Sequence, residues 1–168
     1  GFVSAVAISP DGRWVASASE DQSIALLDAQ TGEAKRRLVG HTGWVIDVAF
    51  SPGGRTLISA GADRTVRLWD VAQETPVVTI VPHDAAVNAV AISADGNRAA
   101  SASFDGSIRL WDLRTGKPQR QWPGREGEGE ALDVLFVPGS TLLASAGEDG
   151  TFLTREDVTE QTKTHGGR

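Results

Sequence analysis

The stretch GHTGWVIDVAFSPGGRTLISAGADRTVRLWD, residues 40–70, decides the fold of this chain. Its apolar residues alternate up to Phe50, resume at Leu57 and Ile58, and return a third time before Trp69-Asp70. Turns rich in Pro, Gly and Asp separate these three runs, at residues 51–54 and around Asp63. Short apolar runs with β-branched side chains between such turns are typical of strands in β-hairpins. The stretch therefore predicts a small antiparallel sheet.

The same pattern recurs along the chain with a period of 42 residues, because Trp69-Asp70 returns as Trp111-Asp112. The turn residue Asp63 matches Asp21 and Asp105 at the same interval. The first turn of each unit also repeats, as SPDG at 9–12, SPGG at 51–54 and SADG at 93–96. A fixed period between twenty and fifty residues indicates a repeat architecture.

A fourth copy is shifted by two residues, so that Asp149 takes the turn position and Arg155-Glu156 the Trp-Asp position. The extra length lies in GREGEGE, residues 124–130. We therefore expect residues 1–168 to form a single segment of four units, with approximate bounds 1–40, 41–82, 83–124 and 125–168.

Composition excludes several classes of protein. The net charge is −6 with both signs scattered, so the sequence shows neither a basic footprint for nucleic acid nor a polybasic membrane patch. No apolar run approaches eighteen residues, so we expect no membrane insertion. The absence of cysteine excludes disulfides and thiolate metal sites but does not identify the compartment.

Each unit is predicted to contain four short strands, and no window shows the helical period of 3.6 residues. In the third strand of the second unit, Val66 and Leu68 point to one face and Trp69 to the other. A sheet that is apolar on both faces must be covered on both sides, and small sheets achieve this by stacking radially. The predicted fold is therefore all-β, a β-propeller built of four-stranded antiparallel blades. The strands are expected at 2–8, 14–19, 24–27 and 34–38; 44–50, 55–60, 65–70 and 76–81; 86–92, 98–103, 107–112 and 118–122; 131–136, 141–146, 151–154 and 161–164.

These residues carry a resemblance. The Gly40-His41 opening, the SPDG-like turn, the Ser-x-x-x-Asp step and the Trp-Asp close resemble the WD-repeat family of β-propellers. The resemblance extends over essentially the whole chain and is strongest in the second and third units. It implies a buried structural hydrogen-bond network in each of these two units, made of His41, Ser59, Asp63 and Trp69, and of His83, Ser101, Asp105 and Trp111.

The outer units depart from the family pattern. The first keeps Ser17 and Asp21 but has Leu27 in the Trp position. The fourth keeps the Ser and the Asp, as Ser145 and Asp149. Arginines occupy its His and Trp positions, as Arg125 and Arg155.

A Ser, a His and an Asp that recur together also suggest a hydrolase, here one using Ser59 and His41. Nucleophilic serine chemistry needs an exposed hydroxyl, a base within reach and oxyanion donors. The repetition of the set, and the lack of a nucleophile elbow, favour the structural role instead. We therefore expect no catalytic residue.

No cofactor or metal site is expected either. The histidines at 41, 83 and 165 are too far apart in sequence to suggest a metal site. Each Asp-Gly turn offers too few carboxylates for calcium, and no phosphate-binding loop is present.

The resemblance implies that partners dock on the narrow rim, at the start of each innermost strand and beside the turn Asp. Large apolar residues occupy several of these positions, and aromatic anchors on a rim are typical of binding hot spots. An alternative is that they pack against neighbouring loops. The predicted partner-binding rim comprises Phe2, Trp44, Ile46, Asn88, Phe104 and Leu132. The acidic loop 124–130 is expected to be a solvated connection, with contact to a basic partner as the alternative.

The function predicted from these features is a non-catalytic scaffold that binds other proteins or peptides. Alternatives are a sensor or regulatory domain attached to an enzyme elsewhere in a parent chain, and an accessory subunit of a larger assembly. Four blades in an open arc would leave both terminal faces uncovered, to be completed by further blades of a longer chain, by a second copy or by another protein. The absence of Met and the excess of Arg over Lys favour a piece of a longer, bacterial protein.

Overall fold

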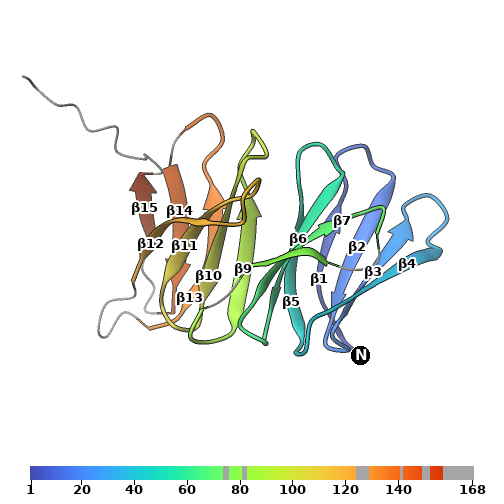
Figure 1. Ribbon diagram of the computed structural model, residues 1–168, viewed down its shortest axis with the longest axis horizontal. Coiled ribbons are helices and arrows are strands. Elements are labelled where there is room, and N and C mark those ends of the chain that lie inside the picture. The colour runs from blue at the N-terminus through green and yellow to red at the C-terminus, as the bar shows by residue number, and fades with distance from the viewer. Residues whose placement is uncertain (74–75, 81–82, 124–128, 141, 149–151, 157–168) are drawn as a thin grey trace, which may run out of the picture.

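The structure is a computed structural model that describes residues 1–73, 76–80, 83–123, 129–140, 142–148 and 152–156 (Figure 1). Side chains are described for these residues except in 76–80 and 152–156. The first sheet contains β1 (Val3–Ile8), β2 (Trp14–Ser19), β3 (Ser23–Asp28) and β4 (Ala34–Val39). The second contains β5 (Val45–Phe50), β6 (Thr56–Gly61), β7 (Val66–Asp70) and β8 (Pro76–Ile80). The third contains β9 (Val87–Ile92), β10 (Arg98–Ser103), β11 (Ile108–Asp112) and β12 (Pro118–Trp122), and the fourth contains β13 (Ala131–Phe136), β14 (Leu142–Gly147) and β15 (Phe152–Glu156).

Within each sheet the strands lie side by side in chain order and pair antiparallel. The four sheets follow one another through the molecule, since β1 contacts β5, β5 contacts β9, and β9 contacts β13 (Figure 1). The described chain thus has the all-β architecture of stacked, four-stranded propeller blades that the sequence predicted. The fourth blade has three described strands, and the strand predicted at 161–164 lies outside the described residues. Residues 124–128 of the acidic loop lie outside them too.

Some strand boundaries differ from those expected. The strand predicted at 24–27 runs from Ser23 to Asp28, because the backbone ladder continues past the apolar residues to the pairs Ser23↔Val39 and Trp14↔Asp28. Phe2 was expected in the first strand but precedes it, and β1 begins at Val3. Periodicity of apolar side chains marks the buried part of a strand and misses polar residues that still pair through their backbone.

The two faces of each blade pack against different neighbours. In the second blade, Leu57 and Trp69 join the core shared with the first blade, whereas Ile58 and Leu68 join the core shared with the third. A further core lies between the third and fourth blades, with Ala100 on one side and Val134 on the other. Apolar burial is therefore concentrated at the junctions between blades, where it stabilises their stacking.

Among the described residues no helix is present, so none is long and apolar enough to span a membrane.

The turn that follows the second strand needs a left-handed backbone in each of the first three blades. The residue after the turn Asp has φ of 73° at Gln22, 68° at Arg64 and 79° at Gly106. These positions are equivalent in the repeat, yet only the third carries glycine. A residue with a Cβ pays about 1–2 kcal/mol for this conformation.

We predict that Arg64→Gly raises the free energy of unfolding by up to about 1 kcal/mol, because relief of the left-handed strain exceeds the added chain entropy of glycine. Equilibrium denaturation with urea measures the change. Gly106→Ala is the matched control, and it should lower stability by about 1 kcal/mol. A loss of stability in Arg64→Gly would contradict the strain argument.

Candidate functional site

A chain of hydrogen bonds crosses the interior of the second blade. The indole Nε1–H of Trp69, on β7, donates to Ser59 Oγ on β6 over 2.8 Å. Ser59 Oγ lies 2.7 Å from Nε2 of His41, which precedes β5. The other ring nitrogen of His41, Nδ1, lies 2.9 Å from Asp63 Oδ2 in the β6–β7 turn. The four side chains thus connect two strands, a turn and the entry to the blade.

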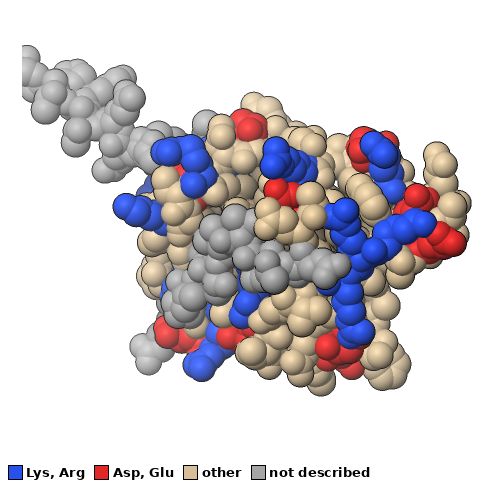
Figure 2. Space-filling view, turned by 45° about the vertical axis from the view of Figure 1, so that its right-hand side comes forward, with Lys and Arg blue, Asp and Glu red and all other residues tan. Residues whose placement is uncertain are grey.

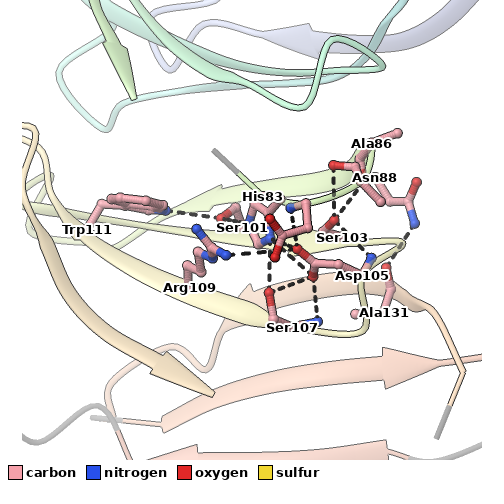
Figure 3. A network of polar contacts seen from close by, with 12 residues as sticks. His83, Ala86, Asn88, Ser101, Ser103, Asp105, Ser107, Arg109, Trp111 and Ala131 are labelled. Atoms are coloured by element: carbon pink, nitrogen blue, oxygen red, sulfur yellow. Dashed lines mark hydrogen bonds and ion pairs between the residues drawn. The ribbon is translucent and has the colours of Figure 1, made fainter. Parts of the chain in front are cut away.

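The third blade repeats this arrangement (Figure 3). Trp111 Nε1–H donates to Ser101 Oγ at 3.0 Å, Ser101 Oγ lies 2.8 Å from His83 Nε2, and His83 Nδ1 lies 3.1 Å from Asp105 Oδ2. Burial lowers the pKa of His83, although the charge of Asp105 opposes this shift. A neutral imidazole with its proton on Nδ1 satisfies both contacts, since Nδ1–H donates to Asp105 and Nε2 accepts from Ser101.

The turn aspartate is the most heavily bonded member of each chain. Asp63 accepts hydrogen bonds from the backbone N–H of Thr42 at 3.0 Å and from the hydroxyl of Thr65 at 2.7 Å, and Arg67 lies 3.5 Å away. Burial alone would raise the pKa of Asp63, but the hydrogen bonds from His41, Thr42 and Thr65 outweigh it and hold this pKa well below its usual value. The carboxylate is therefore stabilised in its charged form.

Two recurring partners of this aspartate were not predicted from the sequence. A hydroxyl two residues after the Asp bonds to it in each of the first three blades, from Ser23, Thr65 and Ser107. An arginine four residues after it approaches in the second and third blades, at positions 67 and 109. The signal was available in the sequence as a D-x-[ST] triplet repeated at the 42-residue period.

In the first blade an arginine, and not a histidine, contacts the turn aspartate Asp21. Arg37, from β4, donates to Asp21 Oδ2 at 2.7 Å and through Nε to Ser23 Oγ at 2.9 Å. In the fourth blade Ser145 is buried, while Asp149 and Arg125 lie outside the described residues. The side chain of Arg155 is not described.

The geometry of the Ser-His-Asp set is unsuited to nucleophilic catalysis. Ser59 has no exposed surface, and His41 is 5% exposed. The Ser59 hydroxyl is already held between Trp69 and His41, so a substrate carbonyl has no approach to it. The described residues also contain no group of three or more His, Cys, Asp or Glu side chains that could hold a metal ion. What this arrangement can do is fix strands within a blade.

The rim positions are held together in pairs by a backbone hydrogen bond that recurs in every blade. The residue before the turn Asp donates its N–H to the carbonyl of the residue that immediately precedes the innermost strand. The pairs are Glu20 with Phe2 (3.0 Å), Ala62 with Trp44 (2.8 Å), Phe104 with Ala86 (3.0 Å) and Glu148 with Glu130 (2.9 Å). Each blade therefore presents two adjacent side chains at the rim.

The six predicted rim residues differ in exposure. Phe2, Trp44, Phe104 and Leu132 are exposed, with Trp44 at 56%. Ile46 and Asn88 are half-buried. Asn88 donates from Nδ2 to the carbonyl of Ala131 in the next blade at 2.9 Å, so the structure gives this side chain a contact between blades (Figure 3).

Comparison with known families agrees with this geometry. The chain matches the family described as WD domain, G-beta repeat over residues 1–28, 32–70 and 74–112. These three matched segments cover more than half of the 168 residues, so the chain belongs to the WD-repeat family. The search of curated proteins finds no match.

We predict that Asp63→Ala lowers the free energy of unfolding by about 1–3 kcal/mol, because His41, the Thr42 N–H and the Thr65 hydroxyl lose their shared acceptor. Thermal or urea denaturation measures the loss. Asp21→Ala, at the equivalent place in the first blade where the carboxylate is exposed and lacks a histidine, should cost less. An unchanged melting midpoint in Asp63→Ala would reject the role of the buried chain.

The depressed pKa of Asp63 also predicts an acid dependence. Its stabilising effect is complete above the ordinary carboxyl pKa of 3.8 and is lost as the pH falls toward the lower pKa of the folded state. The stability difference between the native chain and Asp63→Asn should therefore shrink as the pH falls from about 5 to about 2. Urea denaturation at several pH values checks this, and a constant difference would contradict it.

Proposed function

We propose that this chain is a non-catalytic scaffold that binds proteins or peptides through the propeller rim. The observation that carries the proposal is the set of exposed aromatic side chains in the rim pairs of successive blades. Phe2, Trp44 and Phe104 each belong to one of the backbone-bonded pairs, one in each of the first three blades. Family membership supports an interaction role of this kind.

The placement of these aromatic residues suits an interface. Each lies on a short connection at the end of paired strands, so its backbone is fixed while its side chain faces solvent. Aromatic side chains bury a large area on binding and lose few rotamers, and for this reason they are enriched among hot spots. Exposed together on one rim, they supply apolar anchors for a partner.

The neighbouring charges indicate the chemistry of the partner. Glu20 is paired with Phe2, and the fourth blade presents Glu130 and Glu148 together. We infer that the rim takes a segment with apolar anchors flanked by basic residues. On the face shown in Figure 2 the charges are mixed, since basic and acidic side chains adjoin at the top, right and bottom of the view. This distribution supports a protein partner in preference to nucleic acid.

We predict that the double variant Trp44→Ala, Phe104→Ala folds normally but loses binding partners, because the two anchors are removed without touching the blade junctions. The immobilised chain and its variant are compared by affinity capture followed by mass spectrometry, with circular dichroism to verify the fold.

The control is Arg13→Ala, Arg114→Ala, which changes two exposed residues at the opposite ends of the strands. Partners specific for the rim should be retained by this control. If the Trp44→Ala, Phe104→Ala variant keeps every partner that the native chain binds, the rim is not the binding surface.

A further inference from the structure

The innermost strands of neighbouring blades are linked by two kinds of polar contact. In the first kind, a side chain donates to a backbone carbonyl of the next blade. The Ser4 hydroxyl donates to the carbonyl of Val45, and the Asn88 amide donates to the carbonyl of Ala131. The two donors are equivalent in the repeat, as are the two acceptors. This contact therefore joins the first blade to the second and the third to the fourth.

The second kind joins the second blade to the third. Asp47 Oδ1 accepts the N–H of Val48 in its own strand at 2.8 Å, and Oδ2 accepts the N–H of Val90 across the junction at 2.9 Å. Burial raises the pKa of Asp47, although both backbone donors oppose this rise. The position equivalent to the donors Ser4 and Asn88 is occupied in the second blade by the apolar residue Ile46. The two kinds of junction thus alternate along the chain.

The fourth blade carries the features of the second. Asp133 takes the place of Asp47, and Leu132 takes the place of Ile46. Asp133 Oδ1 accepts the N–H of Val134 at 2.8 Å, as Asp47 does with Val48. Its other oxygen accepts no hydrogen bond from the residues that the structure describes. Asp133 thus occupies the position from which Asp47 accepts the N–H of Val90 in the next blade.

The first blade carries the features of the third. Ala5 and Val6 are equivalent to Ala89 and Val90, the residues that meet Asp47 at the second junction. Val6 pairs with Ser17 as Val90 pairs with Ser101, so the N–H of Val6 has the same orientation in its strand as the one that Asp47 accepts. The chain therefore has an acceptor at one terminal blade and the matching donor at the other.

The apolar surfaces of the two terminal blades match in the same way. Val6 is 65% exposed, whereas the equivalent residues Val48, Val90 and Val134 are 5%, 6% and 3% exposed because the preceding blade covers them. Val3 and Ile8 are exposed beside it. On the fourth blade Leu135 is exposed at the position where Ala49 packs into the core shared with the third blade.

We propose that a second copy of this chain covers both faces, with the first blade of each copy packed on the fourth blade of the other. Asp133 of one chain accepts the N–H of Val6 of its partner, as Asp47 does with Val90 within the chain. Two such junctions close a ring of eight blades, a number within the range known for propellers. The alternation of contacts continues without a break around this ring. The proposal does not depend on the binding function of the rim.

Sedimentation equilibrium and light scattering of the 168-residue chain test the proposal. The expected particle has twice the chain mass of 17.7 kDa and does not grow further with concentration, because a closed ring leaves no free face. Val6→Glu places a charge on the apolar face and should give a folded monomer. Trp44→Glu, a comparably exposed apolar residue on the rim, is the control and should remain dimeric.

Asp133→Ala tests the polar contact separately. It should raise the dimer dissociation constant about tenfold or more, since a hydrogen bond to a carboxylate is lost at both junctions. Asp84→Ala removes an exposed carboxylate away from the junction and should leave the constant unchanged. Circular dichroism verifies that each variant folds.

A monomeric native chain would overturn the proposal. A particle mass that keeps rising with concentration would overturn it as well, because it indicates an open assembly. A dimer that persists in both Val6→Glu and Asp133→Ala would overturn it too, because the copies would then meet through another surface.

Discussion

The structure depends on the burial of two apolar faces on each sheet. Leu57 and Trp69 on one face of the second blade, and Ile58 and Leu68 on the other, can leave water only when a neighbouring blade lies on each side. No single blade of about forty residues could stabilise itself by its own core. Stacking of the blades is therefore the physical condition for folding, and the polar contacts hold each blade together and join it to the next.

The buried polar chains meet that need within a blade. Trp69, Ser59, His41 and Asp63 satisfy one another, so the indole and imidazole groups enter the core without leaving a donor or acceptor unpaired. The Ser59 hydroxyl in this set is held between Trp69 and His41 and has no exposed surface. The burial of this set directs the interpretation of function away from the interior and toward the rim.

Much of this could be predicted from the sequence, because a 42-residue period and the opposite directions of Leu68 and Trp69 follow from residue order alone. What could not be predicted are contacts that depend on how blades meet. Asp47 gives no signal in the alternation of its strand, and its partner Val90 is supplied by a different unit. Arg37 replaces histidine beside Asp21 from a polar outer strand that carries no family pattern. Asn88 was assigned to the rim, and only the geometry shows its bond to the next blade.

The backbone bond that joins the two residues of each rim pair has a consequence for how such surfaces diversify. Because main-chain atoms form the bond between Trp44 and Ala62, or between Glu130 and Glu148, the geometry is indifferent to which side chains are attached. Mutation can exchange an aromatic for an acid there without disturbing folding. Recognition and architecture are thus encoded by separate sets of atoms, which leaves the recognition set open to selection for new ligands.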